Sequence, residues 1–304
     1  MQPLLDAIAA MAAFPQDAQR LFHGRGGLYP GCEHLALDAY PPALLLTSFK
    51  PLDDDELATV SAAMVARWPD APWVYQCRGE RAETRLMAGT MTDPHAVTEA
   101  GTRYLVHLLR GQNHGLFLDM AEGRRWVREH VEPGAKVLNL FAYTCAFSVV
   151  ALQAGAAEVI NVDMASGALA IGRTNHELNG VKAGAKFLAH DIFNSWGKLT
   201  RGGPYDLVVC DPPSFQKGSF VATKDYARLA RRLPALLAPG GQALLCLNAP
   251  ELGLAFLRDV VAENAPELEF IGRVANPVAF RDQSEERSLK VLAYRAPATT
   301  AGSP

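Results

Sequence analysis

Short apolar runs alternate with amphipathic stretches from about residue 134 onward. The first five runs are KVLNLF, AEVINVD, AKFLAHD, YDLVVCD and QALLCLN. Helical periodicity fills the gaps, as in CAFSVVALQAG, SGALAIGRTNHELNG and KDYARLARRLPALLAPG. Near-continuous apolar strands that alternate with helices indicate a parallel sheet covered on both faces. Right-handed crossovers then predict a doubly wound α/β domain. The last two runs, LEFIGRVA and SLKVLAYR, predict an added pair of edge strands.

The pattern differs before residue 100. HLALDAY, ALLLTSF, WVYQCR and TRLMAG predict strands, and a helix is expected over residues 53–68, where three aspartates stabilise the helix N-terminus. The opening segment MQPLLDAIAAMAAFPQ predicts a short amphipathic helix, and AEGRRWVREHV predicts another before the main domain. We therefore expect a small α+β domain over residues 1–95, a main domain over residues 96–296 and a flexible tail over residues 297–304.

Composition and charge place limits on the compartment and on metals. The 304 residues are 49% hydrophobic and 20% charged, as in ordinary globular proteins. No apolar run approaches the roughly 18 residues of a membrane helix, and the N-terminus lacks the basic start of a signal peptide. A cytoplasmic protein without a membrane partner is therefore expected, and its oligomeric state stays open. The five cysteines contain no C-x-x-C pair, which argues against a zinc site, so no metal is expected.

The overall charge does not indicate a general nucleic-acid binder. The net charge is −3 and the pI is near 6.2, whereas phosphate neutralisation usually requires a basic excess. A role with RNA would have to depend on local basic patches, each of which is more simply interpreted as a solvated helix face or loop. The candidate patches are Arg20, His23 and Arg25; Arg124, Arg125 and Arg128; and Arg228, Arg231 and Arg232.

Polar residues follow each apolar run, at the edge where a doubly wound sheet binds ligands. The first run leads into FAYTCAFS, and the later runs are followed by Asp163, Asp191, Asp211 and Asn248. The first turn lacks G-x-G-x-x-G and the acids repel phosphate, so NAD and ATP fit poorly. S-adenosylmethionine carries no phosphate, and its carboxylate can meet backbone groups at the start of the following helix. Asp163 can then accept from the ribose hydroxyls and Asp191 from the adenine amino group. Alternatively, each acid is the N-cap of the next helix.

The segment Asp211-Pro-Pro-Ser-Phe is the most specific signal. Two prolines after a buried strand fix an extended loop and remove two N–H donors. Such a loop can hold Asp211 against a flat amine while Phe215 stacks on a base, which is worth roughly 1–3 kcal/mol. This geometry suits methyl transfer, which needs an in-line nucleophile more than strong acid–base chemistry. The alternative is a rigid turn with a core phenylalanine.

Several motifs together resemble one family. GLFLDM, VLNLFAYTCAFSV, INVDMA, NHELNG and VVCDPPSF are similar to the bacterial large-subunit ribosomal RNA methyltransferases of the RlmI and RlmK type, over roughly residues 96–296. The resemblance implies a Rossmann-like class I methyltransferase with a mostly parallel seven-stranded sheet. It also implies S-adenosylmethionine as cofactor and 23S rRNA or a ribosomal precursor as partner. RLFHGRGGLYPG resembles part of the small α+β domain that precedes the catalytic domain, for which recognition of the RNA substrate is expected.

The resemblance carries specific residues. The expected catalytic residues are Asp211, Pro212, Phe215 and Asn248. The expected cofactor contacts are Phe117, Asp119, Asn139, Phe141, Ala142, Tyr143, Asp163, Met164, Asp191, Ile192, Asp211 and Pro212. Two positions depart from the family pattern. Cys145 stands where many relatives have glycine, and the basic residue after FLD is displaced, so that Arg124 or Arg125 takes its role. We expect Cys145 to be a small packing group in the first helical turn.

The end of the fifth strand separates two kinds of family member. Those that form 5-methylcytosine supply a thiolate there, which adds to C6 of the base. The aligned residue here is Asn248, and both Cys246 and Cys210 are interpreted as core residues. This arrangement is closer to members whose product is 7-methylguanine, because transfer to a ring nitrogen needs no covalent intermediate. Asp211 and Asn248 would hold the base by hydrogen bonds, with Phe215 stacked on it.

The leading hypothesis is thus an enzyme that transfers a methyl group from S-adenosylmethionine to a base nitrogen of large-subunit rRNA. The alternatives are a 5-methylcytosine rRNA methyltransferase with Cys246 as nucleophile, a methyltransferase with a protein or small-molecule acceptor, and a non-catalytic ribosome-assembly factor. The acidic pI favours the second alternative. Arg281, Asp282 and Arg287 either line the substrate mouth or form a salt-bridged loop.

Overall fold

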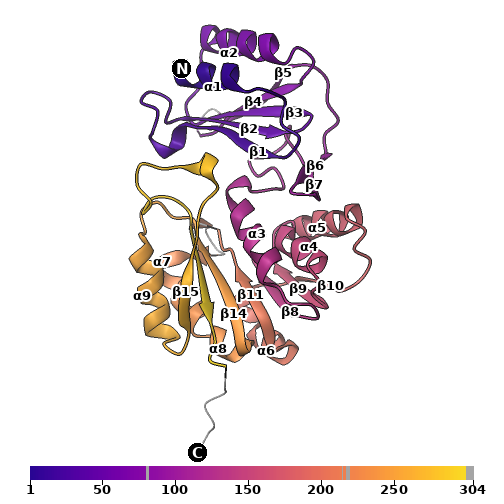
Figure 1. Ribbon diagram of the computed structural model, residues 1–304, viewed down its shortest axis with the longest axis vertical. Helices are drawn as coiled ribbons and strands as arrows, with labels where there is room; N and C mark the ends of the chain where they lie inside the picture. Colours follow the sequence, from indigo (N-terminus) through magenta and orange to yellow (C-terminus); the bar gives the residue numbers. More distant parts are fainter. Residues whose placement is uncertain (80–81, 214, 217–219, 299–304) are drawn as a thin grey trace, which may run out of the picture. The chain divides into compact units, whose positions relative to one another are not determined.

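The computed structural model describes the backbone of residues 1–79, 82–213, 215–216 and 220–298, and the side chains of these residues except 215 and 216. The chain forms two compact units (Figure 1). The N-terminal unit comprises Met1–Asp119 and Pro277–Ser284, and the C-terminal unit comprises Met120–Asn276 and Glu285–Pro304.

The N-terminal unit extends past residue 95, where the sequence predicted a boundary. It includes a hairpin of β6 (His95–Glu99) and β7 (Thr102–Val106). This hairpin is hydrogen-bonded to the segment before β1, since the N–H of Ala18 donates to the carbonyl of Thr98 at 2.7 Å. A hydrogen bond between such distant positions leaves no trace in apolar periodicity.

A five-stranded sheet with the order β1-β2-β3-β4-β5 forms the centre of the N-terminal unit. β3 and β4 are parallel, and the other pairs are antiparallel. The crossover helix α2 connects the parallel pair, and Asp53 and Glu56 form a capping box at its start. The elements are α1 (Gln2–Ala10), β1 (Gln19–His23), η1 (Gly24–Gly26), β2 (Leu35–Tyr40), β3 (Ala43–Ser48), α2 (Asp54–Arg67), β4 (Trp73–Cys77) and β5 (Glu83–Ala88).

The two faces of this sheet differ in polarity. Leu46 and Tyr75 pack with Ile8 of α1 and Val60 of α2 in one hydrophobic cluster, so both helices cover one face. Because side chains alternate along a strand, the neighbouring residues point to the opposite face. Among the latter are three buried polar residues: Asp38, Thr47 and Gln76.

The C-terminal unit contains a seven-stranded sheet with the order β10-β9-β8-β11-β14-β16-β15 (Figure 1). Only β16 runs antiparallel to its neighbours. The predicted doubly wound, mostly parallel seven-stranded sheet is therefore confirmed. Its strands are β8 (Lys136–Leu140), β9 (Glu158–Asp163), β10 (Ala185–Ala189), β11 (Tyr205–Cys210), β14 (Leu237–Leu247), β15 (Glu269–Val274) and β16 (Lys290–Arg295). Its helices are α3 (Ala121–His130), α4 (Ala146–Gln153), α5 (Ser166–Leu178), α6 (Trp196–Gly202), α7 (Ala222–Ala230), α8 (Leu233–Leu236) and α9 (Leu254–Asn264). Shorter elements of the chain are η2 (Leu118–Met120), η3 (Ile192–Asn194), β12 (Phe215–Gln216), β13 (Phe220–Val221) and η4 (Val278–Phe280).

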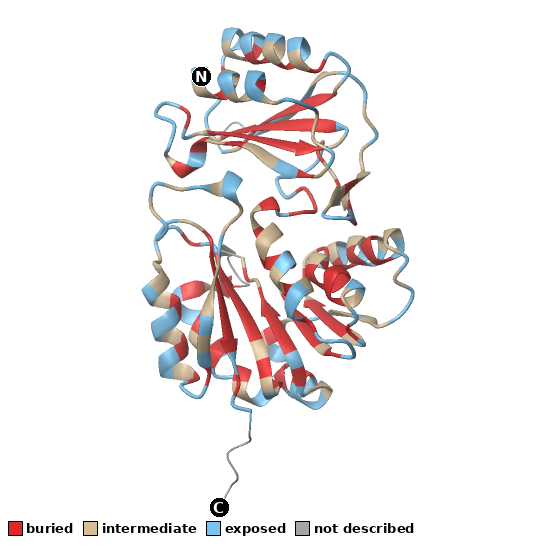
Figure 2. Cartoon of the chain, viewed as in Figure 1, coloured by how far each residue is buried: buried red, intermediate tan, exposed pale blue. Residues whose placement is uncertain are grey.

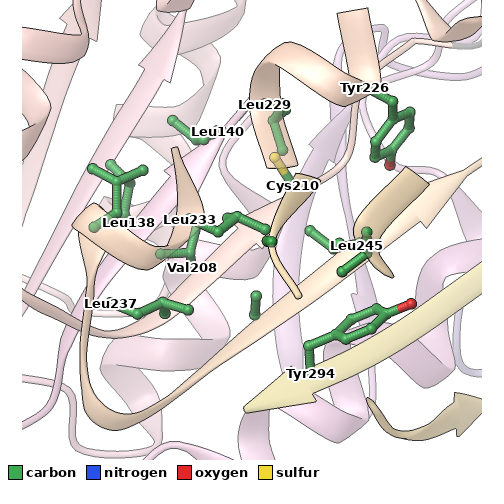
Figure 3. Close-up of a cluster of buried hydrophobic side chains, with 14 of the residues drawn as sticks. Leu138, Leu140, Val208, Cys210, Tyr226, Leu229, Leu233, Leu237, Leu245 and Tyr294 are labelled. Atoms are coloured by element: carbon green, nitrogen blue, oxygen red, sulfur yellow. The ribbon is translucent and has the colours of Figure 1, made fainter. Parts of the chain in front are cut away.

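Helices bury the central strands from both sides, and Figure 2 shows these strands as buried along most of their length. On one face, Val208 and Leu245 pack with Tyr226 of α7 and Leu233 of α8 (Figure 3). The other face packs against α3 and α4 through a second cluster that includes Val127. The apolar runs of the sequence thus form strands that are buried on both faces, as expected.

The stretch KDYARLARRLPALLAPG predicted one continuous helix, and this prediction is wrong. The structure has α7, a separate one-turn helix α8 and then the start of β14 at Leu237. Pro234 lies in the first turn of α8, where its missing N–H is tolerated, but inside a longer helix it would remove a hydrogen bond.

Candidate active site

The carboxyl ends of β8, β9, β10, β11 and β14 meet at one edge of the C-terminal sheet, because these neighbouring strands are parallel. The chain builds the sheet outward from β8 in one direction and then returns to place β11 on its other side. That reversal makes the loops after β8 and β11 the switch point, where open α/β sheets bind ligands.

The loop between β8 and α4 enters the left-handed region three times. Phe141, Tyr143 and Cys145 have φ angles of 57°, 46° and 62°. Such conformations cost of order 1–3 kcal/mol each in residues other than glycine, and they concentrate at functional sites. Two backbone hydrogen bonds hold the path: Ala142 donates to Val162 at 3.1 Å, and Cys145 donates to Ala142 at 2.7 Å. The loop therefore has the positive φ angles that usually require glycine, although it contains no glycine.

Asp163, at the end of β9, stabilises this loop from the next strand. One carboxylate oxygen accepts the N–H of Tyr143 at 2.8 Å, and the other accepts the N–H of Ala165 at 2.8 Å. Each oxygen has a further lone pair, so the carboxylate can accept additional hydrogen bonds, for example from a vicinal diol. Met164 follows with 54% of its surface exposed, which leaves an apolar side chain beside the carboxylate.

Asp191 caps the 3-10 turn η3. Its Oδ1 accepts the N–H of Phe193 at 2.8 Å, and the side-chain amide of Asn194 donates to its Oδ2 at 2.6 Å. The N-cap interpretation is thus correct for Asp191, and its contact with a cofactor stays a prediction. Ile192 is buried and Phe193 is half-buried, so an apolar surface lies directly beside this acid.

Asp211 begins the loop after β11. It is half-buried, and its N–H donates to the carbonyl of Leu140 at 3.5 Å, which joins this loop to the end of β8. Pro212 is buried. Ser214 and the side chain of Phe215 lie outside the described residues, so stacking of Phe215 on a base stays a prediction.

At the end of β14, the exposed residue is an asparagine and the buried residue is a cysteine. Asn248 is exposed immediately after the strand, whereas Cys246 is 0% exposed within the cluster that packs on α3 and α4. On the adjacent strand β16, Lys290 is also 0% exposed, and its Nζ donates to the carbonyl of Ala249 at 2.8 Å. Lys290 was missed by sequence reasoning, although a lysine inside the apolar run SLKVLAYR was a usable signal.

Asn139 belongs to a buried polar network below the edge. It is 1% exposed, and its amide donates to Oδ1 of Asn161 at 2.9 Å. Asn161 donates in turn to the hydroxyl of Ser148 at 3.0 Å, and this hydroxyl lies 2.9 Å from Nε2 of His176. The network connects β8 and β9 with α4 and α5, so it positions the edge from below. The contact of Asn139 with the cofactor stays a prediction.

All five cysteines of the chain are buried. Burial raises the pKa of the thiols of Cys145 and Cys210 well above their ordinary values, which keeps them protonated at neutral pH. Cys145 is the N-cap of α4, with its side chain against α5, where a Cβ added to Gly172 would lie 2.5 Å from its Sγ. Cys145 and Cys210 are therefore packing groups, as the sequence indicated for both.

The residues at this edge suit S-adenosylmethionine chemically. Asp163 can accept from the ribose hydroxyls, while Met164 and Phe193 offer apolar contact for the adenine. No side chain caps α4, so the first N–H groups of this helix can receive the carboxylate of the methionine part. No phosphate has to be accommodated beside the aspartates. When bound, this cofactor supplies a methyl group on a positively charged sulfur.

Seven other predicted positions lie elsewhere. Phe117, which is 43% exposed, and Asp119 belong to the N-terminal unit, and their contact with the cofactor stays a prediction. Of the two arginines after FLD, Arg124 is 3% exposed, whereas the side chain of Arg125 is 66% exposed and pairs with Glu122. Of the remaining three, Arg281 and Asp282 fall in the N-terminal unit and Arg287 is exposed in the C-terminal unit.

Comparison with known proteins identifies the family. The model of a family described as S-adenosylmethionine-dependent methyltransferase matches residues 19–295. The chain belongs to this family. The predicted cofactor is thereby confirmed as that of the family. A SAM-dependent methyltransferase fold from Streptococcus mutans superposes with a TM-score of 0.83 at 25% identity, over 94% of this chain and 76% of that one.

Two relatives bear on the finer resemblance. Ribosomal RNA large subunit methyltransferase I of Aeromonas salmonicida is 30% identical over 77% of this chain and 62% of its own length. The protein of the same name from Erwinia tasmaniensis is 30% identical over 84% of this chain and 68% of its own length. The resemblance read from the motifs is thus confirmed. The chain spans about 62% of the length of the first of these relatives.

Two negative findings apply to the part of the chain with described coordinates. None of its helices has the length and apolar character needed to cross a membrane. Within the same residues, no group of three or more histidine, cysteine, aspartate or glutamate side chains has a metal-binding arrangement.

Proposed function

We propose that this protein transfers a methyl group from S-adenosylmethionine to a ring nitrogen of a base in large-subunit ribosomal RNA, with a 7-methylguanine-like product. Two findings support the proposal, the first for its substrate class and the second for its cofactor. The relatives from Aeromonas salmonicida and Erwinia tasmaniensis are both named as large-subunit rRNA methyltransferases, and they match most of this chain. The edge of the C-terminal sheet provides the cofactor-binding chemistry described above.

The burial of every cysteine is the observation that favours a nitrogen acceptor. Formation of 5-methylcytosine requires a thiolate that reaches C6 of the base. Cys246, the thiol nearest in sequence to the expected nucleophile position, is 0% exposed, and the exposed residue at the end of β14 is Asn248. A thiol with no exposed surface does not reach a base.

Methyl transfer to N7 of guanine needs no general acid or general base from the protein. N7 carries a lone pair and no proton, so the N–C bond can form while the S–C bond breaks and its electron pair leaves on sulfur. The requirement is in-line placement of the two atoms. In this proposal Asp211 and Asn248 hold the base by hydrogen bonds from neighbouring strand ends, and Phe215 stacks on it. The rigid proline at position 212 limits the movement of Asp211.

Mass spectrometry of large-subunit rRNA nucleosides from wild-type and deletion cells tests the proposal. Loss of one methylated purine in the deletion strain, restored by the wild-type gene and not by Asp211→Ala, is the expected result. Loss of 5-methylcytosine would instead support the covalent alternative. Unchanged rRNA, with label from S-adenosylmethionine transferred to protein or metabolite, would contradict the RNA assignment. Failure to bind S-adenosylmethionine in calorimetry would support a non-catalytic assembly factor.

A further inference from the structure

The face of the N-terminal sheet opposite α1 and α2 carries two arginines beside one phenylalanine. Phe49 follows β3 and Arg78 follows β4, so both lie at the carboxyl ends of the parallel pair, where Arg78 donates its N–H to the carbonyl of Ser48 at 2.8 Å. Arg25 comes from η1. The guanidinium carbons of Arg25 and Arg78 lie 3.9 Å and 5.7 Å from the centroid of the Phe49 ring. We call these three residues the arginine clamp.

Hydrogen bonds fix Arg78 in place. Its Nε donates to Oε1 of Gln76 at 2.9 Å, and its Nη2 donates to the carbonyl of Gln112 at 2.6 Å. Gln76 is 1% exposed, so this support comes from the interior of the sheet face. A guanidinium that is already ordered loses less conformational entropy when it binds a ligand.

Close backbone approach fixes the turn that carries Arg25. Glycines flank it on both sides, and a Cβ on Gly24 would overlap the carbonyl oxygen of Cys32. A Cβ on Gly26 would likewise overlap the carbonyl oxygen of Arg281. The motif HGRGG therefore encodes a tightly packed turn that presents one arginine, and Arg25 itself is exposed.

The buried carboxylate on this sheet face already pairs with a third arginine. Asp38 is the buried carboxylate of this sheet face, and Arg20 already occupies both of its oxygens at 2.5 Å and 3.1 Å. Within the described part of the chain, neither Arg25 nor Arg78 forms an ion pair with a carboxylate. Desolvation lowers the pKa of both, and the charge of Arg20 adds to the lowering in each case. Like charges held together in this way are stabilised by a bound anion.

A neutral histidine stands next to these cations. Nδ1 of His23 lies 2.6 Å from Nη1 of Arg20, an N–H donor, so Nδ1 accepts. Burial and the charge of Arg20 lower the pKa of His23 to about 4, so the ring is neutral at pH 7 with its proton on Nε2. The face thus presents N–H donors together with two arginines that form no ion pair with a described carboxylate.

We infer that the arginine clamp binds a phosphodiester group of the RNA substrate. This inference rests on the proposed function, which it deepens by assigning a contact for the RNA backbone. Guanidinium groups match phosphate oxygens in bidentate geometry. The whole chain has a net charge of −3, so attraction of RNA has to come from a local field of this kind. Since Arg25 already covers the ring of Phe49, the phenylalanine orders the cation and is not a stacking platform for a base.

The test uses the full-length variants Arg25→Gln and Arg78→Gln. Binding of a large-subunit rRNA transcript is measured at several salt concentrations, and binding of S-adenosylmethionine is measured separately by calorimetry. We expect each variant to weaken RNA binding about tenfold and to reduce the slope of log K against log salt by about 1, because one phosphate contact is lost. Cofactor affinity should stay within about twofold of wild type. Arg78→Lys, which keeps the charge, should retain most of the salt slope.

Arg85→Gln is the matched control. Arg85 lies in the same unit with its guanidinium 5.4 Å from the ring of Tyr75, but Glu83 neutralises it at 3.2 Å. We expect its RNA binding to equal that of wild type. The inference would be overturned if both clamp variants bound RNA with the affinity and the salt dependence of the wild type. It would also be overturned if the variants lost affinity for S-adenosylmethionine, because the clamp would then bind the cofactor's carboxylate. If RNA binding depended on the clamp but no methyl group were transferred to RNA, the proposed function would be contradicted and the clamp inference would remain. Thermal unfolding of each variant verifies that it folds. Arg25→Gln changes an exposed side chain, so its unfolding temperature should equal that of the wild type.

Discussion

The carboxylate of Asp163 accepts the backbone N–H of Tyr143 at 2.8 Å, across 20 residues of sequence. Tyr143 has a φ of 46°, so this hydrogen bond holds a non-glycine residue in a left-handed conformation. The same carboxylate has lone pairs left for a ligand. The acid at the end of β9 therefore shapes the loop after β8 and can also bind the cofactor directly.

Asp163→Ala should weaken the binding of S-adenosylmethionine by about 10–100-fold, since both the loop brace and the acceptor for the ribose are lost. Isothermal titration calorimetry measures the affinity. Asp259→Ala, which removes an exposed carboxylate on α9, is the control and should bind normally. Equal affinities in the two variants would remove Asp163 from the cofactor site.

Asp211→Ala should abolish methyl transfer, because the acid on the loop after β11 is expected to hold the acceptor base. Loss of one such positioning group costs about 10²-fold or more in turnover. Transfer of labelled methyl groups to rRNA from a deletion strain measures the effect, with circular dichroism as the control for folding. Turnover close to wild type would contradict the site assignment.

Gly172→Ala should destabilise the protein by about 1–3 kcal/mol through overpacking, because the new Cβ would lie 2.5 Å from Sγ of Cys145. In a Cys145→Gly background the same change should be neutral or stabilising, since alanine favours a helix by up to about 1 kcal/mol over glycine. Urea unfolding of the four proteins in a double-mutant cycle measures the coupling.

Gly167→Ala is the control for this pair, since it lies on the same helix and its added Cβ would meet nothing within 4 Å. An equal cost of Gly172→Ala in both backgrounds would show that the cysteine and the glycine are not complementary.

Cys246→Ala should retain methyl transfer within about threefold of wild type, because a ring-nitrogen acceptor needs no covalent intermediate. The wild-type protein should likewise fail to trap RNA that contains 5-fluorocytosine. Denaturing gels detect the trapped adduct. An inactive Cys246→Ala variant that folds normally, together with trapping by wild type, would establish the 5-methylcytosine alternative.

His23 should make the N-terminal unit less stable at acidic pH. Burial, followed by the charge of Arg20, lowers its pKa from 6.5 to about 4. As the pH falls through that window, the unfolded chain takes up a proton that the folded chain does not, so the free energy of unfolding decreases. His23→Gln should lose less stability than wild type over the same range. Urea unfolding at several pH values measures the difference, and parallel curves for the two proteins would contradict the assignment.

The C-terminal fold and the polar residues at its edge could be predicted from the sequence. Apolar runs buried on two faces have a strong signal of their own, and the acids that follow them are read directly from the chain. Capping residues are local too, and so the helix beginning after Asp53 was placed within a residue of its observed start. The same logic failed at Pro234, where a local helix breaker was passed over within a helical pattern.

Which of these residues contact one another depends on the packing of the folded chain. The Asp163–Tyr143 brace, the Cys145–Gly172 contact and the support of Arg78 by Gln112 connect positions that are far apart in sequence. Local propensity does not encode such pairs, because they depend on which strands become neighbours and on which face each side chain lies. For the same reason the arginine clamp depends on the pairing of β3 with β4. The local sequence predicts the helices and strands, whereas the contacts between residues distant in sequence arise from how these elements pack.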